Sequence, residues 1–405
     1  MGLYKFFPQP NDRMAELWAL IPIEGCAILE YGPAGTTHFA IEGIGHFEAE
    51  KRCYLATTDI DGNDVALGLT ERLEITIDEI AKNQKPPYLF VSASSVSSVI
   101  GTDIESICNM LQPNYSETKL IPLTSGGISG MFTKGLEEIF LKIVKLIVKP
   151  PKTKSAHKFN IIGSSIDDCY FNADSLEIIR IMQGAFNMEC GCLFTSNCSI
   201  NHIETMSEGA INIVIRKEGL KAAEYLKDNY NIPYVYEKPY GLEKTLGWIK
   251  KIADVLNLNL NEDFLNNEIS LLKKQVQQIK RINLMRNRSC IISGNYDTVK
   301  GIEYFASQEC GFKIADKWCD NQQYGDDDVP FRTEAEWIKI IKEYDGNLLL
   351  SDAIAISLAN SNVHCHQISN PNLKRHLTYP YAPLVGFRGA LYLLQVFFNI
   401  PSSMF

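Results

Sequence analysis

Cysteine and histidine side chains gather in two stretches of this 405-residue chain. The first stretch, "CGCLFTSNC", holds three of the eleven cysteines: Cys190, Cys192 and Cys198. The second surrounds a Gly-Pro-Ala-Gly turn and holds Cys26, His38, His46 and Cys53. Thiolate and imidazole groups bind zinc, iron and iron–sulfur clusters in proteins. Each set therefore predicts a metal or cluster site, and small cysteines that fill an apolar core are the structural alternative.

The turn itself is the sequence "YGPAGTTHF" at 31–39, which follows a short apolar run. Gly-Pro-x-Gly at the end of a strand forms a sharp turn whose backbone another group can approach closely. Thr36 and His38 come directly after it and are candidates to meet that group. A second apolar run, "YLFVSAS", also ends in small residues, at Ser94 and Ser95.

Predicted strands and helices alternate along most of the chain. Strands are expected at 88–94, 159–165, 211–215, 289–295 and 347–353. Helices are expected at 135–148, 219–230 and 262–287, and a further helix is expected to start at Asp174 or Ser175 and to stop at Gly184. The pattern predicts three consecutive Rossmann-like α/β domains with parallel sheets, at residues 1–150, 151–287 and 288–405.

Ligands of such sheets bind beyond the carboxyl ends of the strands. Six turns are therefore candidate walls of a site: 32–37, 92–102, 163–168, 191–199, 293–297 and 350–353. The stretch "GSSIDD" lacks the glycine patterns of nucleotide-binding loops, and its two adjacent aspartates would repel a phosphate. No nucleotide site is expected in this chain. The acidic run "GDDDVPF" at 325–331 is expected to be a solvated turn.

The formal charge of −9 excludes the basic surface that a nucleic acid or an anionic membrane needs. No apolar run reaches the roughly 18 residues of a membrane span, and the first residues lack the order of a signal peptide. A cytoplasmic protein is expected, in which the cysteines are thiols rather than disulfides.

Several motifs occur in an order that is typical of one family. They are "YGPAGTTHF", "VSASSVSSVIGTDIESI", "NIIGSSIDD", the Ile-Pro and Pro-x-Gly-x-x-x-Thr landmarks within 209–256, and "NPNLKRHLTYPYAPLVGFRGALYLLQVFFN". This ordered set resembles the component 1 proteins of nitrogenase and their relatives. These relatives include a cofactor-assembly scaffold, reductases of protochlorophyllide and chlorophyllide, and a nickel-tetrapyrrole cyclase. The resemblance spans nearly the whole chain.

The sequence differs from the family at the positions of the family's cluster-binding and cofactor-binding residues. Thr36 stands where the family has a cysteine after Gly-Pro-x-Gly, and Ser94 or Ser95 lies nearest to a second cysteine position. No cysteine occurs near 8–11 or near Arg216, where the family has further ligands. A neutral hydroxyl cannot supply thiolate charge to iron. His376 has the spacing of a cofactor histidine, but "KRH" at 374–376 also resembles the Asp-Arg-His of non-catalytic relatives.

The resemblance implies a subunit of a nitrogenase-like, low-potential oxidoreductase that receives electrons from an ATP-dependent iron–sulfur reductase protein. It implies pairing with a homologous subunit, as a homo- or hetero-oligomer, with the substrate in the cleft between the domains. His376 and His38 are the predicted catalytic residues, and the predicted cofactor-binding residues are Thr36, Ser94, Ser95, Cys192 and Cys198. The partner subunit either supplies or shares the iron–sulfur cluster or metal cofactor, or cysteines of this chain hold it. The candidate metal ligands in this chain are Cys26, Cys53, Cys190, Cys192 and Cys198.

Two other functions fit the same residues. A chain that keeps the fold without the cluster cysteines suits a non-catalytic scaffold or carrier for assembly of a metal cofactor. The third interpretation is a small-molecule-binding α/β protein with hinge-separated lobes and no redox chemistry.

Overall fold

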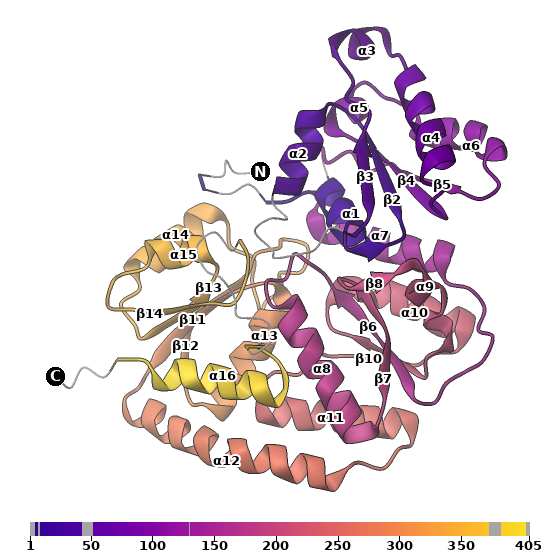
Figure 1. Ribbon diagram of the computed structural model, residues 1–405. Helices are drawn as coiled ribbons and strands as arrows, with labels where there is room; N and C mark the ends of the chain where they lie inside the picture. Colours follow the sequence, from indigo (N-terminus) through magenta and orange to yellow (C-terminus); the bar gives the residue numbers. More distant parts are fainter. Residues whose placement is uncertain (1–4, 7–8, 43–51, 129, 372–381, 402–405) are drawn as a thin grey trace.

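The computed structural model describes residues 5–6, 9–42, 52–128, 130–371 and 382–401. Within these ranges, three four-stranded sheets follow one another along the chain, and every strand pair in them is parallel. Figure 1 shows the first sheet in indigo and violet, the second in magenta and the third in orange, each flanked by helices. The predicted architecture of consecutive Rossmann-like parallel sheets is confirmed. No helix in the described ranges is long and apolar enough to cross a membrane.

The first sheet has the strand order β3-β2-β4-β5. Its strands are β2 (Ala27–Tyr31), β3 (Tyr54–Thr57), β4 (Tyr88–Ala93) and β5 (Lys119–Leu123). Every residue of the two central strands β2 and β4 is buried, which explains why their sequences do not alternate between apolar and polar. The accompanying helices are α1 (Asp12–Leu20), α2 (Ala34–Glu42), α3 (Gly62–Leu67), α4 (Glu71–Asn83), α5 (Ser95–Val99), α6 (Ile104–Leu111) and α7 (Phe132–Ile147).

The second sheet has the order β10-β9-β6-β7. Its strands are β6 (Lys158–Ser164), β7 (Glu189–Thr195), β9 (Ile211–Val214) and β10 (Tyr234–Tyr236). Its helices are α8 (Phe171–Phe186), α9 (Ile200–Glu204), α10 (Leu220–Tyr230) and α11 (Gly241–Leu256). The long helix α12 (Glu262–Met285) then leads to the third sheet.

The third sheet has the order β12-β11-β13-β14. Its strands are β11 (Ser289–Gly294), β12 (Lys313–Cys319), β13 (Leu348–Ser351) and β14 (His364–Gln367). Its helices are α13 (Tyr296–Tyr304), α14 (Glu334–Glu343), α15 (Ala353–Leu358) and α16 (Gly386–Phe398). Helix α16 returns along α8, α11 and α12 and so covers the middle of the molecule, as Figure 1 shows in yellow.

The three sheets share apolar cores. One core joins side chains of the second and third sheets with α16, and another joins α1 and α7 to the second sheet. The short strand β1 (Ile23–Glu24) also pairs in parallel with β8 (Cys198–Ser199), which ties the first unit to the second. The domain boundaries at 150 and 287 remain predictions, and apolar packing is continuous across both of them.

The predicted start and stop of helix α8 are wrong. The helix begins at Phe171, and Asp174 lies inside its first turn, where its carboxylate pairs with Lys238. The helix also continues through Gly184 and ends at Asn187 in the left-handed conformation. Gly184 is small because α12 crosses there: a Cβ on it would lie 2.3 Å from the ring of Phe264.

Candidate functional site

The turn at 32–35 is filled by the protein itself. A Cβ built on Gly32 would lie 2.3 Å from the Cβ of Ser94, so the group that approaches this glycine is the first residue after β4. Ser94 is fully buried and its Oγ accepts a hydrogen bond from Ser97 N, which caps α5. The Oγ1 of Thr36 donates to Pro33 O at 2.8 Å. The hydroxyl groups that replace the expected cysteines therefore hold the local fold together.

A buried ion pair lies behind this turn. Glu30, within β2, is fully buried and pairs with Arg13 of α1, whose Nη2 also donates to Thr36 O at 3.2 Å. Burial raises the pKa of Glu30, and the Arg13 guanidinium acts against this rise. The first sheet thus keeps the shape of a strand-end site, and the Arg13–Glu30 pair lies behind its turn, although Arg13 Nε and Glu30 Oε2 have no hydrogen-bond partner among the described residues.

The structure brings the two cysteine sets together at the junction between the first two sheets. Cys26 and Cys53 lie close to Cys198, which in turn lies close to Cys192. These four thiols are buried, and Cys190 is half-buried beside them. The neighbouring Cys53 thiol and burial raise the pKa of Cys26. Burial and the neighbouring Cys198 thiol raise the pKa of Cys192. Burial raises the pKa of Cys190 to about 12.

These cysteines do not fit an iron–sulfur cluster. The thiol of Cys26 faces Leu20 O at 3.5 Å and Ile23 O at 3.3 Å, so it already has backbone acceptors. Among the residues that the structure describes, no group of three or more His, Cys, Asp and Glu side chains is arranged to hold a metal ion.

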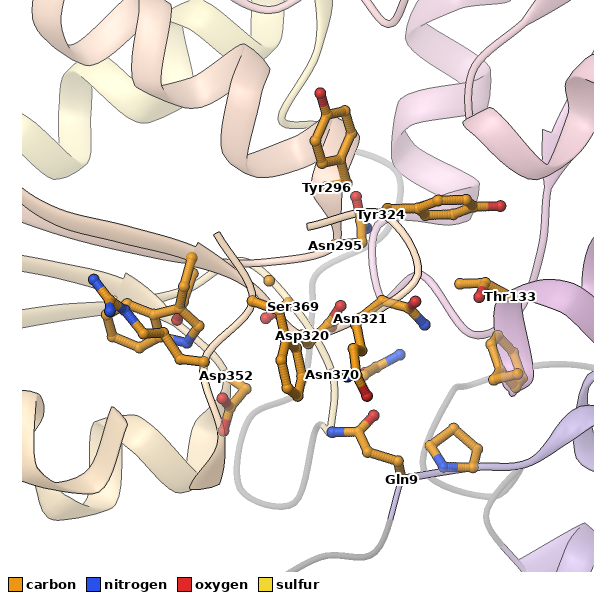
Figure 2. A pocket seen from close by; sticks show the side chains of 18 of the residues that line it. Gln9, Thr133, Asn295, Tyr296, Asp320, Asn321, Tyr324, Asp352, Ser369 and Asn370 are labelled. Carbon is orange, nitrogen blue, oxygen red and sulfur yellow. The ribbon is translucent and has the colours of Figure 1, made fainter. Parts of the chain in front are cut away.

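A cavity of about 490 Å³ lies where the three sheets meet (Figure 2). The third sheet contributes most of its wall, from the carboxyl ends of all four strands: Ser293, Asp320, Asp352 and Ser369. The second sheet contributes Asp167, Arg216 and Glu218, and the N-terminal part contributes Gln9, Pro10, Trp18, Phe132 and Thr133. This location follows the rule for parallel sheets, in which ligands bind beyond the carboxyl ends of strands.

Only some of the predicted walls line this cavity. Residues of the turns 163–168, 293–297 and 350–353 do, whereas none from 32–37, 92–102 or 191–199 does. The predicted site residues are likewise elsewhere: His38 is exposed on α2, Ser95 is half-buried at the start of α5, and the cysteines are in the junction. His46 and His376 lie outside the described residues.

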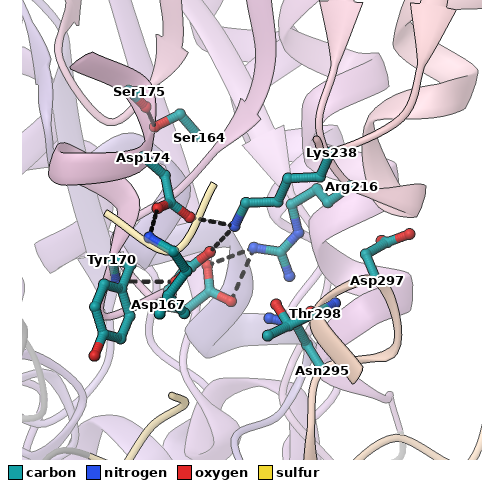
Figure 3. Close-up of polar contacts among 12 residues, drawn as sticks. Ser164, Asp167, Tyr170, Asp174, Ser175, Arg216, Lys238, Asn295, Asp297 and Thr298 are labelled. Atoms are coloured by element: carbon teal, nitrogen blue, oxygen red, sulfur yellow. Dashed lines mark hydrogen bonds and ion pairs between the residues drawn. The ribbon is translucent and has the colours of Figure 1, made fainter. Parts of the chain in front are cut away.

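Arg216 is the cationic centre of the second sheet's share of the cavity. Its Nη1 lies 2.9 and 3.0 Å from the two carboxylate oxygens of Asp167, and its Nε lies 2.9 Å from Glu218 Oε2. Burial alone would lower the pKa of Arg216, but the two carboxylates hold it well above the ordinary value. Figure 3 shows this pair beside a second one, in which Lys238 Nζ lies 2.8 Å from both Asp168 and Asp174.

The aspartates of the third sheet differ from these ion pairs. Burial, together with Asp352 and Glu218, raises the pKa of Asp320 to about 7. Burial also raises the pKa of Asp297 and of Asp352, although both accept backbone hydrogen bonds. The cavity therefore contains one carboxyl group, that of Asp320, whose pKa lies near neutral pH, beside two others whose pKa values are raised.

Asp320 was not among the residues predicted from the sequence, and the reason is local. Strand β12 reads "KIADKWC", lies at the edge of the sheet and has half-exposed positions, so it gives no continuous apolar run. The available signal was the acidic residue directly after Cys319. Arg216 stands where the family resemblance implies a cysteine. Its pair with Glu218 is local, whereas its pair with Asp167 depends on β6 and β9 lying side by side.

Comparison with known families places the chain. It matches the description "Nitrogenase component 1 type Oxidoreductase" over residues 14–400. A similar curated relative is the nitrogenase iron-molybdenum cofactor biosynthesis protein NifE of Clostridium pasteurianum, which is 23% identical over 294 residues, or 71% of this chain and 63% of the relative. Another is a subunit of the light-independent protochlorophyllide reductase of Pelodictyon phaeoclathratiforme, 22% identical over 50% of this chain and 37% of the relative.

The chain therefore spans less than two thirds of the length of these two relatives. Among solved structures, nitrogenase Cp1 at pH 6.5 superposes with a TM-score of 0.77 at 14% identity, over 98% of this chain and 94% of that one. This likeness shows the fold. Because the family match covers nearly all residues and the fold agrees, this protein belongs to the nitrogenase component 1 type oxidoreductase family.

Proposed function

We propose that this chain is the substrate-holding subunit of a nitrogenase-like oxidoreductase, and that a homologous subunit paired with it carries the redox cluster. The observation that carries this proposal is the cavity at the meeting point of the three sheets, which is lined by strand-end carboxyl groups. Its size is within the roughly 300–1,000 Å³ of small-molecule sites. Since the described cysteines do not fit a cluster, no electron-transfer step is assigned to this chain.

An apolar edge of the first sheet supports the pairing with another subunit. Phe39, Val99 and Ile128 are 61%, 75% and 58% exposed, and each follows the carboxyl end of a different strand, β2, β4 and β5. Large exposed apolar side chains at the carboxyl-end side of a sheet favour burial against another protein. An ATP-dependent reductase protein is the proposed electron donor to the assembled pair, in line with the sequence resemblance.

The chain's own contribution to a reduction would be binding and proton supply. A carboxyl group with a pKa of about 7, as at Asp320, is well matched to exchange protons at neutral pH. It lies in the cavity rather than in the thiol junction. His38 is exposed outside the cavity, so the proposed proton donor is Asp320 in place of that histidine.

A scaffold for assembly of a metal cofactor is the second candidate. The similarity to cofactor biosynthesis proteins favours it. The acidic lining of the cavity weighs against it, because iron–sulfur clusters held by thiolates carry negative charge and would be repelled.

The test is to purify the protein without oxygen together with its partner and to measure iron and acid-labile sulfide for each separated subunit. The proposal expects several irons with matching sulfide on the partner and none on this chain. Iron and sulfide on this chain alone would instead support the scaffold. No iron on either subunit would overturn the redox function and leave a small-molecule-binding protein.

A further inference from the structure

Residues that line the cavity carry buried polar atoms with no hydrogen-bond partner in the described part of the chain, and these include Arg332 Nε as well as several oxygen atoms. Ser369 and Tyr324 are only 6% and 8% exposed, and neither hydroxyl group has a hydrogen-bond partner among the described residues. The Oδ1 of Asn370 is also unpartnered. The carboxyl group of Asp320 lies near the carboxylates of Asp352 and Glu218 and accepts a hydrogen bond from its own backbone N–H. Buried polar atoms without partners are costly, so a ligand that satisfies them would gain their hydrogen bonds.

These atoms lie close to one another. The backbone N–H of Asp320 donates to Gly294 O at 2.9 Å, and the Cβ of Ser369 packs against the same glycine. Asn370 follows Ser369 in the chain, and Figure 2 shows the three side chains grouped in the centre of the cavity. Asp320 follows β12, and Ser369 and Asn370 follow β14, the two outer strands of the third sheet. A carboxylate and an amide oxygen accept hydrogen bonds but cannot donate them.

The charges of the lining are unbalanced. The acidic members are Asp167, Glu218, Asp297, Asp320, Glu334 and Asp352, and the cationic members are Arg216 and Arg332. Both guanidinium groups are already paired: Arg216 with two of these carboxylates, and Arg332 with Asp316. The Lys217 ammonium lies over the rings of Tyr296 and Tyr324, 4.7 and 4.6 Å from their centroids, and takes up those ring faces. The charges that face Asp320 are thus Asp352 and Glu218 on one side and an already neutralised Arg216 on the other.

We propose that the cavity binds an organic cation, namely a protonated amine, amidine or nitrogen heterocycle on a flat apolar body, with its charged nitrogen paired to Asp320. This inference rests on the proposed function and adds the class of the substrate. N–H groups of the ligand would donate to the unpartnered oxygens of Ser369 and Asn370. The aromatic wall, which includes Trp318 and Trp337, suits a flat apolar body.

A hard divalent metal is the other cation that oxygen atoms attract. Asp352 is poorly available for it, because its Oδ1 already accepts hydrogen bonds from Ile354 N at 2.7 Å and Ala355 N at 3.0 Å. In the described part of the chain, no group of three or more ligating side chains is arranged around a metal ion. An organic cation needs one anionic partner and several acceptors, and these are present.

The experiment compares three compounds of one shape in calorimetric titrations of the purified chain: benzamidine, benzamide and benzoate, which are cationic, neutral and anionic. The protein is used as wild type, as Asp320→Asn, and as Asp327→Asn. Asp327 is an exposed carboxylate outside the cavity, so its replacement removes the same charge without touching the site. Thermal unfolding establishes that each variant is folded.

We expect benzamidine to bind at least about tenfold more tightly than benzamide, and benzoate not to bind. Asp320→Asn is expected to abolish this preference, and Asp327→Asn to keep it. Equal binding of the three compounds, preference for benzoate, no binding of benzamidine, or an unchanged preference in Asp320→Asn would overturn the inference. Displacement of benzamidine by Mg²⁺ or Ca²⁺ at one ion per chain would overturn it in favour of a metal. These results do not depend on the iron measurement, so the inference and the proposed function fail separately.

Discussion

Arg216 packs its aliphatic stem directly over Gly163: a Cβ on this glycine would lie 2.6 Å from the Cγ of Arg216. Gly163 is next to the last residue of β6 and has a φ of +101°, which side chains rarely tolerate. The contact joins the carboxyl ends of β6 and β9, so the glycine sets how far the guanidinium group reaches toward Asp167. The position of the Arg216 guanidinium group in the cavity therefore depends on the absence of a Cβ at residue 163.

Gly163→Ala is expected to destabilise the protein by about 1–3 kcal/mol, because it adds overpacking to an unfavourable backbone conformation. The measurement is urea-induced unfolding. The matched control is Gly247→Ala, in the middle of helix α11, where a new Cβ would meet nothing within 4 Å. That replacement should stabilise the protein by roughly 0.5–1 kcal/mol. Equal effects of the two replacements would contradict the proposed packing.

The contact between Gly32 and Ser94 can be tested with a double variant, in which the second replacement relieves the overlap that the first one causes. Gly32→Ala should destabilise the fold by about 1–3 kcal/mol, because the new methyl group would overlap Ser94. Ser94→Gly removes the obstacle, and a glycine at this cap position costs only a few tenths of a kcal/mol. The double variant should therefore be more stable than Gly32→Ala alone. Gly35→Ala, which meets nothing within 4 Å, is the control. Additive effects of the two changes would show that the residues do not meet.

The raised pKa of Asp320 makes the free energy of unfolding depend on pH in one direction. Its pKa is about 7 in the folded chain against an ordinary value of 3.8, so the folded state binds more protons between these two values. The free energy of unfolding contributed by this group therefore falls as the pH rises from about 4 to about 7. Asp320→Asn should remove that loss and raise the Tm by roughly a few degrees near pH 8.

The check on Asp320 is a series of thermal unfolding curves across this pH range. The advantage of Asp320→Asn over the wild type should shrink toward pH 4 and vanish below the ordinary pKa of 3.8, where both states of the wild type are protonated. Asp327→Asn, which removes an exposed carboxylate, should show no such trend. A difference between wild type and Asp320→Asn that does not change with pH would refute the assigned ionisation.

The buried thiols are expected to be inert in the native protein. Because Cys26, Cys192 and Cys198 are 1–3% exposed and the pKa values of Cys26 and Cys192 are raised, alkylation by iodoacetamide should be slow until the chain unfolds. Mass spectrometry of tryptic peptides measures the labelling. The half-buried Cys169, Cys190 and Cys365 provide the comparison within the same chain.

Alanine replacements at Cys26 and Cys198 should also leave the iron content of the purified complex unchanged. Each replacement should cost about 1 kcal/mol of stability through the small space that it leaves. Loss of iron together with sulfide in either variant, at unchanged folding, would show that these thiols are cluster ligands after all.

The arrangement of strands and helices could largely be predicted from the sequence. Strands such as β4 and β9 are short apolar runs next to turn residues, and parallel central strands are buried on both faces, so local pattern and final environment agree. The end of α8 was mispredicted because Gly184 serves a crossing helix rather than a helix stop. A glycine that is small for the sake of a distant neighbour cannot be distinguished locally from one that ends a helix.

The site was harder to predict than the fold. Asp320, Asp352 and Ser369 follow three different strands, and only the order of the third sheet brings them to one edge. The cysteines remain predicted ligands. Their types and spacing indicate a metal site, and the structure buries Cys26, Cys192 and Cys198 near the pairing of β1 with β8. The residue types indicate which chemical groups the chain contains. The tertiary packing determines which of these groups lie in the cavity and which are buried away from it.

The return of helix α16 onto α8, α11 and α12 restricts how the molecule can move. The second and third sheets are connected once through α12 and again through α16, and Leu384 N, just before α16, donates to the buried carboxylate of Asp174 at 2.7 Å. The second and third sheets are thus held together at two separate places along the chain. A change in the angle between these two sheets would have to break the packing of α16 as well as bend α12.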